Sequence, residues 1–334
     1  MDKAYIKVIS YYLPDKILSN EMLSEEFPEW NAEKIASKIG INERHLSAPN
    51  ETATDMATQA AEKLFAENPI IKREEVDFVL LCTQSPDYFL PTSACLIQEK
   101  LGLRTNIGAF DYNLGCSGFV YGLSIAKGLI CAGVATNVLL LTSETYSKYL
   151  HPKDKSNRTI FGDGASATIV STEGFAEIGH FSLGTDGRGA KNLMVATGGS
   201  RRQGRCNDLS FDENTNPISS DYLYMNGAEI FNFTMEAVPI LIKDTLLKNN
   251  LGQDNIDLFI FHQANKYIMN FMRKKIKIDE DKFYYCLENV GNTVSSTIPI
   301  ALYEAKREGR LVGDILLAGF GVGYSWAGTI LKCK

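Results

Sequence analysis

The feature that most constrains this chain is an internal repeat, because its second half follows the layout of its first half. Three pairs of segments carry the similarity: 75–82 (EVDFVLLC) with 255–262 (NIDLFIFH), 111–116 (DYNLGC) with 287–292 (LENVGN), and 137–142 (NVLLLT) with 314–319 (DILLAG). A duplication spread over 334 residues predicts two similar halves, which we place at 1–172 and 173–334.

The segments between these matches predict the secondary structure of each half. The apolar runs at 76–82 and 256–261 are continuous rather than alternating, which is typical of strands buried on both faces. Segments 54–68 and 230–248 place apolar residues at helical spacing. Strands that alternate with helices favour an α/β fold in which helices cover parallel-rich sheets. The polar, aperiodic segment 198–217 predicts a long surface loop.

The repeat places three chemically useful side chains just after strand-like runs. Cys116 and Asn292 occupy matching positions in the two halves, and His262 directly follows the run 256–261. The ends of buried strands are where α/β proteins place their chemistry. The three positions therefore suggest one reaction centre built across both halves.

Cys116 lies in the motif GCSG, directly before an apolar helical run at 119–130. The positive end of a helix favours thiolate and lowers the pKa of a cysteine, and thiolate is the form that attacks a thioester carbonyl. The alternative is a buried structural cysteine, which is what most free cysteines are.

His262 and Asn292 each have an ordinary interpretation besides a catalytic one. A lone histidine is often a satisfied core residue, although His262 ends a buried strand within FHQAN and histidine titrates in the useful range. Asn292, within GNT, is typical of a turn or a helix N-cap. Together, an amide N–H and a histidine N–H can stabilise a developing oxyanion or enolate.

Composition and motifs exclude several other classes of protein. The net charge of −6 disfavours nucleic-acid binding, and the seven cysteines, none spaced as Cys-x-x-Cys, fit a reducing cytoplasm. No His, Asp or Glu cluster has metal-ligand spacing. The start of the chain shows no apolar leader, and the uncharged run 315–331 is broken by glycines, so we expect no membrane span. The motif GFGVG at 319–323 has too little chain after it for a dinucleotide fold.

Seven motifs in order identify a family resemblance that covers essentially the whole chain. They are YLP (12–14), GINERH with APNE (40–45 and 48–51), GCSGF (115–119), FGDGA (161–165), HQAN (262–265), GNT (291–293) and FGVGYSW (320–326). With them the chain resembles β-ketoacyl-[acyl-carrier-protein] synthase III, a member of the thiolase-like superfamily. The resemblance implies a homodimer whose subunits have a five-layer α-β-α-β-α fold made of two duplicated halves.

The resemblance also implies a reaction and a triad formed by Cys116, His262 and Asn292. Cys116 would take an acyl group from an acyl-CoA, and malonyl carried on acyl carrier protein would then lose CO2 and condense with it, starting fatty acid synthesis. His262 and Asn292 would hold the oxygen of the enolate. The backbone N–H groups of Cys116 and Val322 would form the oxyanion hole. No metal or redox cofactor is implied.

Further positions follow from the resemblance for coenzyme A and for the carrier protein. Trp30 matches a tryptophan that stacks on the adenine, while Lys38, Lys155 and Arg158 fall at or near family arginines, and lysine stacks less well than a guanidinium. The expected carrier-docking residues are Lys266, Arg273, Lys274 and Lys275. The alternative for these four is a solvated charge run, although an acidic chain makes a local basic patch more telling for an acidic carrier.

Phe89 and Leu90 belong to a loop, 84–91, that in the family reaches across the dimer to close the acyl pocket. Leu90 replaces the phenylalanine of some relatives, which predicts room for primers longer or more branched than acetyl.

Three functions are alternatives to that of a synthase III. An acyltransferase could pass the cysteine-bound acyl group to a different acceptor in a specialised pathway. A non-enzymatic partner subunit would lack the nucleophile that Cys116 provides. A hydroxymethylglutaryl-CoA synthase would need a catalytic glutamate ahead of the cysteine, where the nearest matching loop has Gln84.

Overall fold

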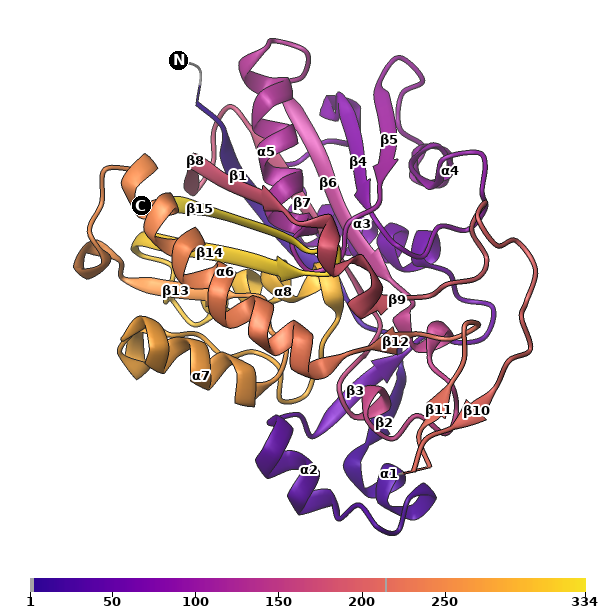
Figure 1. Cartoon of the computed structure of the whole chain (residues 1–334). Helices are drawn as coiled ribbons and strands as arrows, with labels where there is room; N and C mark the ends of the chain where they lie inside the picture. Colours follow the sequence, from indigo (N-terminus) through magenta and orange to yellow (C-terminus); the bar gives the residue numbers. More distant parts are fainter. Residues whose placement is uncertain (1–2, 214) are drawn as a thin grey trace.

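The computed structural model describes residues 3–213 and 215–334, arranged around one large sheet (Figure 1). Its strands are β1 (Tyr5–Tyr12), β4 (Phe78–Cys82), β5 (Gly108–Tyr112), β6 (Asn137–Glu144), β7 (Gly164–Ser171), β8 (Ala176–Thr185), β13 (Leu258–Phe261), β14 (Gly313–Gly321) and β15 (Ser325–Cys333). The main helices are α3 (Ala53–Glu67), α4 (Ser93–Lys100), α5 (Gly118–Cys131), α6 (Gly227–Lys248), α7 (Lys266–Ile276) and α8 (Thr297–Arg307). The expectation of no apolar leader falls partly on residues 1–2, which lie outside the described residues.

The large sheet consists of two half-sheets, one from each half of the chain. The strand order is β13-β14-β15-β8-β1-β7-β6-β4-β5, so β1 and β8 meet at the junction. These two strands pair only at Tyr5 with Glu177 and at Ile6 with Ala176. The half-sheets therefore separate away from this short junction. The predicted boundary between residues 172 and 173 falls in the turn between β7 and β8.

Helices α5 and α8 fill the space between the half-sheets. Leu80 of β4 and Ile260 of β13 both point into the apolar cluster that these helices share. The neighbours of Leu80 point the other way, toward α3 and α4, while those of Ile260 point toward α6 and α7. Both faces of each half-sheet are thus buried, as the continuous apolar runs predict. The resulting layers are helices, sheet, helices, sheet and helices (Figure 1).

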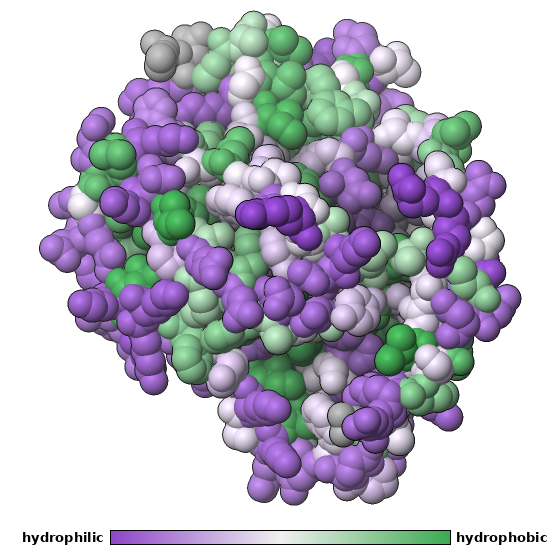
Figure 2. All heavy atoms as spheres, viewed as in Figure 1, coloured by the Kyte–Doolittle hydropathy of each residue, from purple (hydrophilic) through white to green (hydrophobic). Residues whose placement is uncertain are grey.

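A smaller cap lies at the lower end of the molecule in Figure 1. It contains β2 (Lys16–Ser19), α1 (Asn20–Glu26), α2 (Ala32–Ile39) and β3 (Glu43–Leu46). Figure 2 shows apolar surface in the hollow between this cap and α6. Among the described helices, none combines the length and apolarity needed to cross a bilayer.

Three expectations about local structure need correction. The sheet is mixed rather than parallel-rich, because within it only β4–β5, β4–β6 and β13–β14 are parallel among the described residues. The turn 322–324 between β14 and β15 is too short for a parallel crossover. The run before Asn292 is not a strand, and only an isolated bridge joins Phe283 to Phe259.

The third correction concerns the predicted loop 198–217. It contains the short strand β10 (Ser210–Phe211), which pairs with β11 (Pro217–Ile218). Position 214 of this segment lies outside the described residues. Two further short strands, β9 (Leu193–Met194) and β12 (Tyr224–Met225), pair with each other on either side of it.

The start of α5 predicts a specific sensitivity to added volume. A Cβ at Gly118 would lie 2.2 Å from the sulfur of Cys82, which is fully buried and cannot move into solvent. We expect Gly118→Ala to lower the free energy of unfolding by about 1–3 kcal/mol in urea denaturation. Gly128→Ala is the matched control, because a Cβ there on the same helix meets nothing within 4 Å. Equal stability of the two variants would contradict the packing.

Candidate active site

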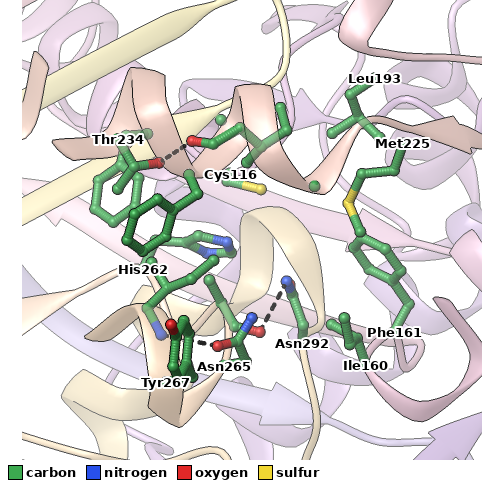
Figure 3. Close-up of a pocket in the computed structure, with 17 residues that line it drawn as sticks. Cys116, Ile160, Phe161, Leu193, Met225, Thr234, His262, Asn265, Tyr267 and Asn292 are labelled. Atoms are coloured by element: carbon green, nitrogen blue, oxygen red, sulfur yellow. Dashed lines mark hydrogen bonds between the residues drawn. The ribbon is translucent and has the colours of Figure 1, made fainter. Parts of the chain in front are cut away.

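Cys116, His262 and Asn292 line a single cavity of about 300 Å³. Cys116 lies between β5 and α5, His262 directly follows β13, and Asn292 lies in the loop before α8. Figure 3 shows the sulfur, the imidazole ring and the side-chain amide pointing into the same space. The rest of the wall is mostly apolar and includes Ile160, Phe161, Leu193, Met225, Ile230 and Phe320.

The end of β14 packs closely against Cys116. A Cβ added to Gly321 would lie 2.9 Å from the Cβ of Cys116 and 3.0 Å from its sulfur. Any larger residue at position 321 would collide with the Cys116 side chain. The second half of the chain therefore forms part of the surroundings of a cysteine from the first half. Cys116 is 7% exposed, on the side of the cavity.

The pKa of Cys116 differs from the expectation of a lowered value. Burial and, to a lesser extent, the carboxyl of Glu144 raise the pKa to about 12, although the residue's own backbone N–H opposes the rise. Cys116 lies just before α5, which begins at Gly118 and has Ser117 as its N-cap. The thiol therefore needs a proton acceptor at the moment of reaction.

His262 is in the neutral state that such an acceptor requires. Burial lowers its pKa to about 3. Its Nδ1 lies 2.8 Å from the Thr297 hydroxyl oxygen, and that hydroxyl donates to the Val294 carbonyl at 3.0 Å. Because Thr297 has only one proton to give, it accepts from Nδ1–H. The lone pair of the imidazole then lies on Nε2.

Asn292 is fixed by both its backbone and its side chain. Its backbone N–H donates to Ile160 O at 2.9 Å, and its carbonyl accepts the N–H of Gly162 at 3.0 Å. The side-chain oxygen accepts the Val294 N–H at 2.9 Å, and Nδ2 donates to Ala264 O at 3.4 Å. One Nδ2 hydrogen is left for a ligand in the cavity.

The two backbone groups expected to form the oxyanion hole are the N–H groups of Cys116 and Val322. In the parts of the chain that the structure describes, no carbonyl accepts the N–H of Cys116 or of Val322. Val322 directly follows β14 and packs in the cluster around Cys116. Their role as a pair stays a prediction.

The residues expected to bind coenzyme A lie outside the cavity, near the cap. Trp30 and Lys38 line a depression of about 180 Å³ beside α2. Lys155 forms an ion pair with Glu29, next to Trp30, so these two predicted positions are neighbours. Arg158 pairs with Glu26 and donates to Pro152 O, which ties its guanidinium into the cap.

Three of the four expected carrier-docking residues share one groove. Lys266, Lys274 and Lys275 line a depression of about 640 Å³ together with Lys38. Tyr267 lines both this groove and the cavity, so the two are adjacent. Arg273 does not line the groove, because its side chain bonds Ile278 O and Glu280.

The two expected acyl-pocket residues do not reach Cys116 within this chain. Phe89 is 86% exposed and Leu90 is 83% exposed, and neither lines the cavity. Their role depends on a second subunit and stays a prediction.

The sequence reasoning missed three residues that complete the site. Thr297 holds the His262 ring, Gly321 gives the sulfur its space, and Glu144 lies buried near the thiol. Gly321 stood within the motif FGVG, but only the approach of β14 to Cys116 gives it a reason. In the described residues no group of three or more His, Cys, Asp or Glu could hold a metal ion.

Comparison with known proteins identifies the family of the chain. Residues 110–187 match the family described as 3-oxoacyl-[acyl-carrier-protein] synthase III, and residues 246–333 match the C-terminal part of that family. A β-ketoacyl-[acyl-carrier-protein] synthase III of Caldanaerobacter subterraneus subsp. tengcongensis is 37% identical over 325 residues, which is 96% of this chain and 95% of the relative. The chain belongs to the synthase III family.

Solved structures of the family have the same fold. A 3-oxoacyl-[acyl-carrier-protein] synthase III crystal structure is 51% identical with a TM-score of 0.96, covering 99% of each chain. A 3-oxoacyl-[acyl-carrier-protein] synthase from Burkholderia xenovorans LB400 is 34% identical with a TM-score of 0.90, covering 99% of this chain and 94% of that one. The predicted thiolase-like α/β fold is confirmed. This synthase III chain is an acyl-transferring condensing enzyme that initiates fatty acid synthesis.

The burial of His262 predicts an unusual pH dependence. An exposed histidine, with a pKa of about 6.5, becomes protonated below that pH and loses its basic lone pair. His262 keeps its lone pair there because burial lowers its pKa to about 3. The rate of acylation should therefore show no acid limb between about pH 5 and pH 7. Unfolding monitored at each pH is the control. A fall in rate centred near pH 6.5, in protein that stays folded, would contradict the neutral buried imidazole.

Proposed function

We propose that Cys116 is the residue that takes the acyl group, with His262 and Asn292 as its catalytic partners. The observation that carries this proposal is that the three side chains line one apolar cavity although they come from three distant segments. An apolar cavity suits the acyl chain of a thioester, and its low polarity strengthens every hydrogen bond made to a developing charge.

In the first step the thiol proton of Cys116 passes to Nε2 of His262, and the thiolate attacks the carbonyl carbon of an acyl-CoA. The N–H groups of Cys116 and Val322 hold the oxyanion of the tetrahedral intermediate. The carbon–sulfur bond to coenzyme A then breaks, and its thiolate takes a proton from solvent. The acyl group remains on Cys116, and Nε2 of His262 keeps the thiol proton, whose charge the incoming malonyl carboxylate offsets.

In the second step malonyl on acyl carrier protein enters the cavity. The bond between its α-carbon and carboxylate breaks, CO2 leaves, and the electron pair becomes an enolate. Nε2–H of His262 and Nδ2–H of Asn292 donate to the enolate oxygen. The α-carbon attacks the acyl-enzyme, and the departing Cys116 thiolate recovers its proton from His262. Decarboxylation supplies the carbanion equivalent, so the sequence of steps requires no metal or redox group.

The alternative, transfer of the acyl group to a different acceptor, has less support. It requires no group that stabilises an enolate, whereas Asn292 is held with one Nδ2 hydrogen left for a ligand beside His262.

Variants of Cys116 and Asn292 should separate the two steps. Cys116→Ala should abolish acylation in intact-mass spectra, because it removes the nucleophile. Asn292→Ala should still form the acyl-enzyme but release CO2 from malonyl carrier protein about 100-fold more slowly or worse, because one enolate donor is gone. Equal loss of both steps in a folded Asn292→Ala protein would contradict the assigned roles.

We propose that the groove formed by Lys38, Lys266, Lys274 and Lys275 receives the acidic acyl carrier protein. No carboxylate is among its lining residues in the described chain, and it adjoins the cavity at Tyr267. Clustered positive charge accelerates and orients the binding of an acidic partner.

Homodimerisation would place Phe89 and Leu90 of one subunit against the other. The seven cysteines, none of them spaced as Cys-x-x-Cys, fit a reducing cytoplasmic location.

Charge reversal in the groove should affect only the carrier-bound substrate. Lys274→Glu with Lys275→Glu should raise KM for malonyl carrier protein about tenfold while leaving that for malonyl-CoA unchanged, because only the protein contacts the groove. Lys72→Glu, at an exposed position in the other half of the chain, is the matched control. An equal effect on both malonyl donors would place the defect in the cavity instead.

A further inference from the structure

Arg44, in strand β3 of the cap (Figure 1), is a buried cation that the reaction steps above do not use. It is 0% exposed, and no ion pair among the described residues includes it. Burial lowers its pKa to about 10, so the guanidinium still keeps all of its N–H donors near neutral pH. A fully buried charge without a counterion is costly, and its hydrogen bonds must offset that cost.

The hydrogen bonds of Arg44 join the cap to the wall of the active-site cavity. Nη1 donates to Leu18 O at 3.0 Å, and Nη2 donates both to Asn20 Oδ1 and to Thr159 O at 2.8 Å. Leu18 and Asn20 belong to the cap, whereas Thr159 begins the segment 159–162, whose next two residues line the cavity. The guanidinium therefore fixes this segment against the cap.

The same segment holds the backbone of Asn292. The Asn292 N–H donates to Ile160 O at 2.9 Å, and the Gly162 N–H donates to Asn292 O at 3.0 Å. Arg44 packs against both strands of this pairing, because a Cβ added at Gly162 would lie 3.1 Å from the Arg44 Cβ, and one added at Gly291 would lie 2.9 Å from it. Arg44 thus contacts the chain on each side of the Asn292 backbone.

We propose that Arg44 is a positioning residue for Asn292, the residue whose amide donates to the enolate oxygen. The planar guanidinium presents its donors at fixed angles, so it holds segment 159–162 in one place relative to the cap. A shift of that segment moves the Asn292 backbone with it, and a misplacement of about 1 Å can cost about 100-fold in rate. This inference rests on the proposed role of Asn292.

The acylation step should not depend on Arg44. In the described chain neither Cys116 nor His262 is hydrogen-bonded to segment 159–162, and Thr297 holds the His262 ring from the other side of the site. Loss of the Arg44 contacts should therefore slow decarboxylation selectively.

The test compares the two steps in Arg44→Lys, which keeps the positive charge but cannot serve three acceptors from a single ammonium group. Acylation of Cys116 is followed by intact mass with an acyl N-acetylcysteamine thioester, which has no nucleotide and so bypasses the coenzyme A positions on the cap. Its rate should match that of the wild type. Release of CO2 from saturating malonyl carrier protein should be about tenfold slower. Unchanged CO2 release, or equal slowing of both steps, in folded protein would overturn the inference.

Arg104→Lys is the matched control. Arg104 also donates from Nη2 to a backbone oxygen, Val76 O at 3.1 Å, and its Nε, like that of Arg44, has no partner in the described chain. It lies beside the start of β4, whereas Cys116 follows the far end of the parallel strand β5. Both rates should therefore equal those of the wild type.

A double-mutant cycle shows whether Arg44 acts through Asn292. Where Asn292→Ala slows CO2 release about 100-fold, adding Arg44→Lys should cost less than about twofold more, because the amide that Arg44 positions is already absent. A merely structural role would leave the two effects independent, so the double variant would be about 1000-fold slower. That result would overturn the inference.

If Arg44→Lys does not fold, Gly162→Ala tests the same contact from the other side. Its added Cβ would lie 3.1 Å from both the Arg44 Cβ and Val290 O, so the segment must shift by a few tenths of an ångström while the guanidinium stays intact. CO2 release should slow while acylation keeps the wild-type rate. Any other pattern in the folded variant would overturn the inference.

The outcomes separate this inference from the proposed function. If Asn292→Ala slows both steps equally, the assigned role of Asn292 fails whatever Arg44→Lys does. If Asn292→Ala slows CO2 release selectively and Arg44→Lys does not, only the inference fails.

Discussion

The packing of α5 and α8 between the two half-sheets is the interaction on which the site depends. Each helix buries its apolar side chains against strands from both halves of the chain, and the two helices correspond to each other in the repeat. Cys116 directly precedes the N-cap of α5, and the loop from Asn292 leads into α8. Because both helices begin at the same end of the central layer, the duplication brings Cys116 and Asn292, the proposed nucleophile and enolate donor, to one cavity.

Burial then decides the chemistry of that cavity. It keeps Cys116 as a thiol and His262 as a neutral base, so neither group carries a charge until one proton moves between them. Thr297 fixes which nitrogen of the ring receives that proton. Glu144 is also buried, and it accepts hydrogen bonds from Ser85 and Ser295, which join segments around the cavity. The same low polarity strengthens the hydrogen bonds that stabilise the oxyanion and the enolate.

Much of this architecture could be predicted from the sequence, and what could not has identifiable causes. The repeat predicted two similar halves. Together with the continuous apolar runs, it also predicted that Cys116, His262 and Asn292 lie together in one reaction centre. The antiparallel strand pairs of the large sheet could not be predicted. Short turns between strands cause them, and the spacing of apolar residues does not reveal strand direction. The raised pKa of Cys116 depends on burial by distant residues, and the local helix signal suggested the opposite. Glu144 ends an apolar strand and has no motif, so only the folded contacts reveal it.

The central claim is that one cavity performs acylation and decarboxylative condensation in succession on Cys116. The most direct measurement is the intact mass of the wild-type protein after exposure to an acyl-CoA, and again after addition of malonyl acyl carrier protein, with CO2 release followed in parallel. The account predicts a mass gain equal to one acyl group, located on the Cys116 peptide, which disappears as an equivalent of CO2 forms. Acylation that persists in the presence of malonyl carrier protein, with no CO2, would contradict it.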